Sequence, residues 1–133
     1  MKIFSMHSVD YREGKTTMYS YSDATNLLID KFPALKLVYI KDLYEYEGLN
    51  YAFYESVFVK YIMEKIHLSD EMSLNIIFNF IEDILQNGDD EIKNLVEVAV
   101  IESLYFEEDF RKRKVGLTKF FGKLTLQSFS SIN

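Results

Sequence analysis

The sequence contains no cysteine, no tryptophan, a single proline and only two histidines among its 133 residues. Without cysteine, disulfide bonds, thiolate catalysis and thiolate metal sites are excluded. His7 and His67 have no second nitrogen ligand at a metal-binding spacing, so we expect no metal site. Glycine-rich phosphate loops and the GxSxG nucleophile motif are also missing. These absences favour a non-enzymatic protein that uses no cofactor.

Long apolar runs are missing as well. None approaches the roughly 18 residues that a membrane-spanning helix needs. The first 14 residues have neither a continuous apolar core nor a small-residue cleavage site, so we expect no signal peptide. The simplest expectation is a cytoplasmic protein.

Acidic residues are absent from residues 111–133, which carry six basic side chains and a net charge of +6. Residues 1–110 carry nine basic and 21 acidic side chains, a net charge of −12. An acidic body repels nucleic acid, so a nucleic-acid partner is not expected, and a cationic partner suits it better. The net negative charge could instead only keep the protein soluble, so a cationic partner and a solubility role both stay open.

Hydrophobic periodicity predicts an all-α, single-domain bundle of about six helices. The central helix is expected at about 90–105, because DEIKNLVEVAVIESLY places apolar side chains on every side of a helical wheel. The other helices are expected at 23–31, 34–44, 50–67, 70–86 and 117–126. We expect one domain over residues 1–133, with a helical core at 22–125 and a frayed tail at 126–133. Residues 1–20 are compatible with a short hairpin or with a loosely docked arm.

Capping residues predict where the helices at 70–86 and 90–105 begin and end, and polar spacing predicts which helix sides face solvent. Ser69 is expected to cap the helix at 70–86, Gly88 to end it, and Asp89 to cap the central helix. One polar stripe, formed by Ser56, Lys60, Glu64 and His67, predicts the solvent-facing edge of the helix at 50–67. Glu107, Glu108 and Asp109 precede Arg111, Lys112 and Arg113 by four residues each, a spacing that favours ion pairs on a solvated helix.

Glu102 is the residue that fits this scheme least well, because the wheel places it inside the apolar arc of the central helix. A buried carboxylate needs a hydrogen-bond partner. Asn94 and Asn79 are candidate partners, which makes Asn94 and Glu102 structural polar residues. The alternative is that Glu102 lies in a binding pocket.

A short signature around the central helix resembles a known family. The segment FIEDILQNGDDE followed by IKNLVEVAVIESL resembles small, acidic, all-helical bacterial domains of unknown function, which are similar to immunity proteins of polymorphic toxin systems. The residues that carry the likeness are Phe80, Ile81, Glu82, Gly88, Asp89, Glu91, Ile92, Asn94, Leu95, Val96, Val98, Glu102 and Leu104. The likeness covers roughly residues 22–125. It implies a protein that binds and neutralises one cognate toxin.

Three functional hypotheses follow. The first is an immunity protein that binds a basic toxin, such as a nuclease, through acidic and tyrosine side chains; its oligomeric state stays open. The second is a helical enzyme or ligand-binding protein whose aromatic pocket contains Glu102 and a tyrosine hydroxyl. The third is a regulator whose basic tail contacts nucleic acid or an anionic membrane. The first predicts a partner-binding surface made of Tyr44, Glu45, Tyr46, Glu47, Tyr51, Glu71, Asn75, Asn79, Glu82, Asp83, Asp89, Asp90 and Glu91.

Overall fold

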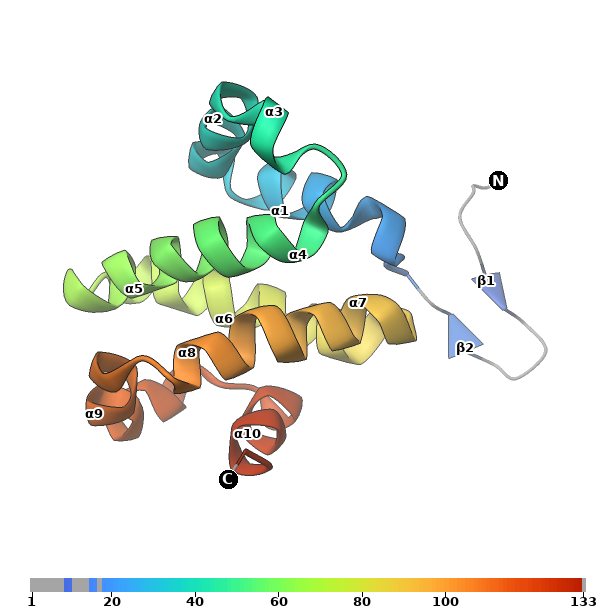
Figure 1. Cartoon of the computed structure of the whole chain (residues 1–133). Coiled ribbons are helices and arrows are strands. Elements are labelled where there is room, and N and C mark those ends of the chain that lie inside the picture. Colours follow the sequence, from blue (N-terminus) through green and yellow to red (C-terminus); the bar gives the residue numbers. More distant parts are fainter. Residues whose placement is uncertain (1–8, 11–14, 17, 133) are drawn as a thin grey trace.

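A computed structural model describes residues 9–10, 15–16 and 18–132 (Figure 1). The predicted all-helical, single-domain fold is confirmed. At the N-terminus, the two-residue strands β1 (Val9–Asp10) and β2 (Lys15–Thr16) pair antiparallel, with Val9 opposite Thr16. The described residues of this segment thus include a strand pair, and residues 18–20 in addition dock on the helices.

Three short helices form the first part of the bundle. A 3₁₀ turn at Tyr21–Asp23 leads into α1 (Ala24–Lys31), and α2 (Pro33–Lys41) follows directly. Pro33 opens α2 as predicted, because the first turn of a helix needs no backbone N–H from that position. Helix α3 (Leu43–Tyr46) completes this group, which lies at the top of Figure 1.

Two long helical rods cross the front of the molecule (Figure 1). The first runs through α4 (Asn50–Phe53), the π-helical segment η2 (Tyr54–Phe58) and α5 (Val59–His67). The second runs through α7 (Asp90–Leu95), the π-helical segment η3 (Val96–Glu102) and α8 (Ser103–Tyr105). Helix α6 (Glu71–Asn87) passes behind both rods.

The second rod is the predicted central helix, and it is less buried than expected. Its inner side is fully packed, with Ile92, Leu95, Val96, Val100 and Leu104 all inaccessible to solvent. Its outer side is open, since Asn94, Glu97, Val98 and Glu102 are exposed. The placement of Glu102 in the apolar arc was therefore wrong. The wheel assumed 100° per residue, whereas a π-helical segment turns less per residue and shifts every later side chain around the axis.

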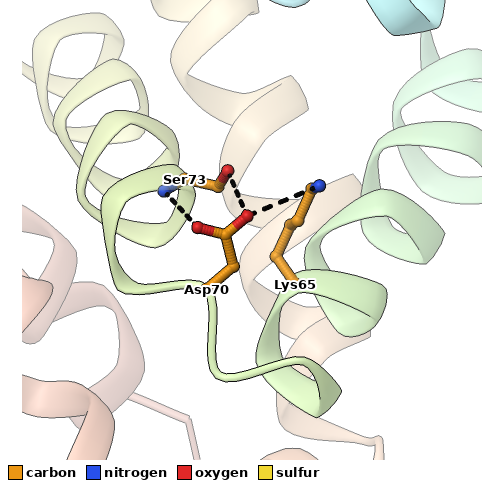
Figure 2. Close-up of polar contacts among 3 residues, drawn as sticks. All are labelled: Lys65, Asp70 and Ser73. Atoms are coloured by element: carbon orange, nitrogen blue, oxygen red, sulfur yellow. Dashed lines mark hydrogen bonds and ion pairs between the residues drawn. The ribbon is translucent and has the colours of Figure 1, made fainter.

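The first rod matches the prediction better, because Ser56, Lys60, Glu64 and His67 are all exposed along one side. The turn to α6 differs from the prediction. Ser69 adopts a left-handed conformation with φ 53° and ends α5, so it cannot cap α6. Asp70 caps α6 instead, accepting hydrogen bonds from the backbone N–H and the hydroxyl of Ser73 (Figure 2). These bonds, together with Lys65 Nζ at 3.6 Å, hold the pKa of Asp70 below its ordinary value.

The C-terminal part corrects two expectations. The solvated helix expected around residues 107–113 is α9 (Glu108–Leu117). Instead of one helix at 117–126, the chain then forms a 3₁₀ turn η4 (Thr118–Phe120) and α10 (Lys123–Ser130). Phe121 and Gly122 separate the last two. Glycine fits at 122 because a Cβ there would overlap the side chain of Glu82. The expected frayed tail at 126–133 is helical as far as Ser130, and its Phe129 is 1% exposed. Phe129 stacks on Phe110 and Phe121 with ring centroids 5.0 Å away, which fixes α10 to the core.

Candidate functional site

The predicted partner-binding residues lie on three segments, and the structure brings two of them together. Asn94 of α7 donates a hydrogen bond of 2.8 Å to the hydroxyl of Tyr51 on α4. The loop before α4 and the start of α7 therefore border one surface at the front of the molecule. Helix α6 lies behind both rods, so its outer residues belong to a different surface (Figure 1).

We call the front surface the acidic face. All of its members are exposed: Glu45, Glu47, Tyr51, Glu55, Asp90, Glu91, Asn94, Val98 and Glu102. Six carboxylates thus line the two rods and the loop that leads into them. Lys93, the basic residue of α7, is half-buried and lines a groove against α10 rather than this face. The acidic face therefore presents negative charge around a small apolar centre formed by Tyr51 and Val98.

The two π-helical segments, η2 and η3, pack against each other beneath this face. π-Helical turns are rare and are found disproportionately at functional sites. Here they carry the exposed residues Glu55, Val98 and Glu102. The sequence predicted continuous α-helices, and no spacing signal in either segment indicates the wider turn.

Three predicted binding residues turn out to hold the fold together. Glu82 accepts hydrogen bonds from the backbone N–H groups of Leu124 and Thr125 and from the Thr125 hydroxyl, at 2.8–3.0 Å. Asp83 accepts from the hydroxyl of Tyr19 and the amide of Asn87. Their assignment to an outward-facing surface was wrong, because the wheel of α6 could not show that the N-terminal segment and α10 pack beside it.

Asp89 is the third of these residues. Its carboxylate caps the central helix at the N–H of Ile92, as predicted, and also accepts from the N–H of Tyr21 at 3.1 Å. Both oxygens are used inside the protein. Among the predicted cluster at the start of α7, only Asp90 and Glu91 remain available to a partner as exposed carboxylates.

Asp83 and Asp89 are both engaged by residues 18–21, which we call the N-terminal strap. The sequence predicted a docked arm here only as one of two alternatives and did not indicate its contacts. Met18 N–H donates to the carbonyl of Asn87, and Asp89 N–H donates to the carbonyl of Tyr19. Tyr19 thereby forms a parallel bridge to Gly88. The hydrogen bond to Asp83 and partial burial raise the pKa of Tyr19 to about 12. The strap also places the ring of Tyr21 6.1 Å from that of Tyr51, at the edge of the acidic face.

A groove of about 470 Å³ lies between the strap, α1 and α6. Asn79 and Asp83 line it, together with Tyr19, Leu27, Asp30, Lys31, Phe80 and Ile84. Of the remaining α6 candidates, Glu71 pairs with Lys119 at 2.9 Å and Asn75 is exposed. These positions are spread along α6 and do not join the acidic face.

The tyrosines of the loop differ in role. Tyr46 is half-buried and packs its ring on Phe53 with centroids 5.3 Å apart; partial burial and the nearby Glu45 raise its pKa. Tyr46 is thus mainly a packing residue. Tyr44 lies on α3, and its side chain is outside the described part of the chain.

The pocket expected to combine Glu102 with a tyrosine hydroxyl is not formed by the described residues. Glu102 is exposed and borders a shallow groove of about 170 Å³ whose lining contains no tyrosine. Asn94 pairs with Tyr51 rather than with Glu102. The ligand-pocket hypothesis therefore loses its geometric basis at this position.

Among the residues that the structure describes, no group of three His, Asp or Glu side chains is arranged to hold a metal ion. Within the same residues, no helix combines the length and apolarity required to cross a bilayer.

Residues 25–132 match the family described as DUF7674, a domain of unknown function. The chain belongs to this family. The match begins in α1 and includes α9 and α10, so the basic C-terminal segment is part of the family domain rather than an appendage. Comparison with curated proteins gave no match, and comparison with solved structures gave none.

Proposed function

We propose that this DUF7674 protein is a non-enzymatic binding module that recognises a basic protein through its acidic face. The observation that carries the proposal is the group of four exposed carboxylates on the two rods, together with Glu45 and Glu47 just before the first rod. Both rods become π-helical beneath the face. Complementary charge accelerates the encounter of a basic partner with such a surface.

The composition of the face also suits a specific interface. Its apolar members, Tyr51 and Val98, are 36% and 39% exposed, and Leu49 just before α4 is 53% exposed. A small apolar centre with a charged rim is the usual arrangement of energetically important interface residues. The hydrogen bond between Asn94 and Tyr51 holds the tyrosine ring in place before binding, which reduces the entropy lost on association.

The partner that fits best is a cognate bacterial toxin, with this chain as its cytoplasmic immunity protein. The support is the resemblance around residues 80–104 together with the charge of the acidic face. A basic nuclease would present the cationic surface that this face complements. In such a complex the immunity protein would cover the toxin's substrate-binding surface rather than catalyse a reaction.

The test begins with affinity-tagged full-length protein expressed in its source cells, followed by mass spectrometry of what co-purifies at low and at high salt. A stoichiometric basic protein that is toxic when expressed alone is the expected result. Asp90→Lys/Glu91→Lys, which leaves the Asp89 cap intact, should then slow association roughly tenfold at low salt. The matched control is Glu64→Lys/Glu107→Lys, two exposed acidic positions near the other end of the rods with the same change of charge. Equal slowing by both variants, or a neutral or acidic partner, would contradict the proposal.

A further inference from the structure

Tyr21 of the N-terminal strap is hydrogen-bonded to both rods. Its backbone N–H donates to the carboxylate of Asp89, the residue that caps α7, at 3.1 Å. Its carbonyl accepts from the side-chain amide of Asn50, the first residue of α4, also at 3.1 Å. In Figure 1 this segment runs from β2 past the start of α7 and into α1. One peptide unit on either side of Tyr21 therefore connects the start of the first rod to the start of the second.

Further hydrogen bonds fix the chain to each rod before and after Tyr21. On the second rod, the N–H of Asp89 donates to the carbonyl of Tyr19 at 2.8 Å. On the first rod, the hydroxyl of Tyr54, which is buried in η2, donates to the carbonyl of Ala24 at 2.6 Å. The strap and the residue that begins α1 are thus bonded more than once to each rod, so the two rods cannot separate at their starts without breaking these bonds.

The side chains at this point continue the connection onto the acidic face. The ring of Tyr21 lies with its centroid 6.1 Å from that of Tyr51, whose hydroxyl accepts from Asn94 of α7. Asn94 stands one helical turn after Asp90 and Glu91, so these side chains are neighbours on the surface of α7. The position of the Tyr51 ring relative to the carboxylates of α7 therefore depends on how the strap spaces the two rods.

We propose that the strap is a positioning element of the acidic face, which fixes the separation between the starts of α4 and α7 and thereby slows release of the basic partner. This inference rests on the proposed function for its effect on binding. A surface that is already ordered loses less conformational entropy on association, and most affinity differences of this kind appear in the dissociation rate. The strap precedes the region matched by the family, residues 25–132, so a segment outside that region tunes a surface built within it.

The first experiment measures the separation of the rods in the full chain without a partner. Because the sequence has no cysteine, spin labels can be attached at Ser56→Cys on the first rod and Glu91→Cys on the second, both exposed positions. Double electron–electron resonance should give one narrow distance distribution. Adding Tyr21→Ala/Asn50→Ala, which removes the ring contact and the amide donor, should broaden the distribution.

Two control variants separate positioning from general loss of stability. Tyr21→Phe keeps the ring and both backbone hydrogen bonds, so it should retain the narrow distribution. Glu82→Gln weakens the attachment of α10 and leaves the strap intact, so it should also retain it. Circular dichroism checks that every variant is folded. An unchanged distribution in Tyr21→Ala/Asn50→Ala would overturn the proposal, as would the same broadening in Glu82→Gln.

The second experiment measures binding kinetics with the basic protein identified by co-purification, using chains without labels. Tyr21→Ala/Asn50→Ala changes no charge, so association should stay within about twofold of the parent while dissociation becomes roughly tenfold faster. Asn50→Ala alone keeps the Tyr21 ring and should still speed dissociation. An effect confined to variants that lack the ring would overturn the positioning role and assign Tyr21 to direct contact with the partner.

Failure of this inference and failure of the proposed function give different results. Unchanged dissociation in Tyr21→Ala/Asn50→Ala, with association still slowed by Asp90→Lys/Glu91→Lys, would overturn the positioning role and keep the binding surface. If no basic partner is found, the proposed function fails and so does the effect on binding, while the spin-label distances decide whether the strap fixes the rods.

Discussion

Glu82 illustrates how one carboxylate can join distant parts of a chain. It lies on α6 and accepts three hydrogen bonds from Leu124 and Thr125 in the first turn of α10. The backbone N–H groups in the first turn of α10 have no acceptor within their own helix, so the Glu82 carboxylate of α6 acts as their cap.

Removal of this cap gives the first prediction. Glu82→Ala should lower the free energy of unfolding by roughly 2–4 kcal/mol, because it leaves the first turn of α10 without acceptors. Glu82→Gln keeps one acceptor oxygen and should lose about half as much. Urea denaturation followed by circular dichroism measures both. Gln86→Ala, one turn later on the exposed side of α6, is the control and should stay within about 0.5 kcal/mol of the parent. A neutral Glu82→Ala would mean that α10 is held by its apolar contacts alone.

Tyr19 gives a prediction about pH. Its pKa is raised to about 12 in the folded protein, whereas an ordinary tyrosine titrates near 10. Because the folded state holds the proton more tightly, the stabilisation is fully present below about pH 10 and is lost as the pH rises toward 12. Tyr19→Phe should therefore lower stability at neutral pH by roughly 1–2 kcal/mol, and the difference from the parent should shrink above pH 10. Urea midpoints measured across this range test the prediction, with Tyr61→Phe as control. A difference that does not change with pH would show that Tyr19 does not hold its proton through Asp83.

At the scale of the element, the turn between α5 and α6 shows how two helices can share a few residues. Ser69 ends α5 in a left-handed conformation, with its N–H donating to the carbonyl of Ile66 and the N–H of Asp70 donating to that of Lys65. This is the arrangement of a helix C-terminus that glycine normally completes. Asp70 then caps the next helix (Figure 2).

A glycine at this position should therefore be stabilising. Ser69→Gly removes the steric cost of positive φ and should raise the free energy of unfolding by about 0.5–1 kcal/mol. Ser69→Ala keeps the Cβ and should be neutral or slightly destabilising, which separates the backbone effect from loss of the hydroxyl. Both are measured by thermal and urea unfolding. A destabilised glycine variant would show that the serine hydroxyl contributes more than the backbone strain costs.

This turn also shows what sequence patterns could and could not predict. Periodicity located the rods and α6, and the cap at Asp89 was predicted because its partner is three residues away. Ser69 was assigned as the cap because serine is a favoured capping residue, but the backbone conformation gives that role to Asp70. Glu82, Asp83 and Glu102 were misplaced for a common reason: their surroundings depend on segments distant in sequence or on a π-helical turn, and a helical wheel contains neither.

At the scale of the whole molecule, the candidate surface was predicted only in part. Asp90, Glu91 and Tyr51 are exposed and border one face, whereas Glu71, Asn75 and Asn79 lie along a helix behind it. The charge asymmetry along the chain becomes a spatial asymmetry, because the rods carry acidic residues near the start of α7 and lead to the basic helix α9.

The hydrophobic core is continuous from the first helix to the last. Buried side chains form one continuous cluster from Ala24 in α1 to Phe129 in α10, so the described helices should unfold as one cooperative unit. The chain has no tryptophan, which allows one to be introduced at each end as a local probe. Tyr39→Trp on α2 and Phe120→Trp before α10 both occupy half-buried positions packed on the core. Fluorescence of either variant should give the same urea midpoint as circular dichroism of that variant, and adding Glu82→Gln should shift all midpoints together. Separate midpoints for the two tryptophans would show instead that α1–α5 and α6–α10 are independently folding units joined by the contact between the two rods.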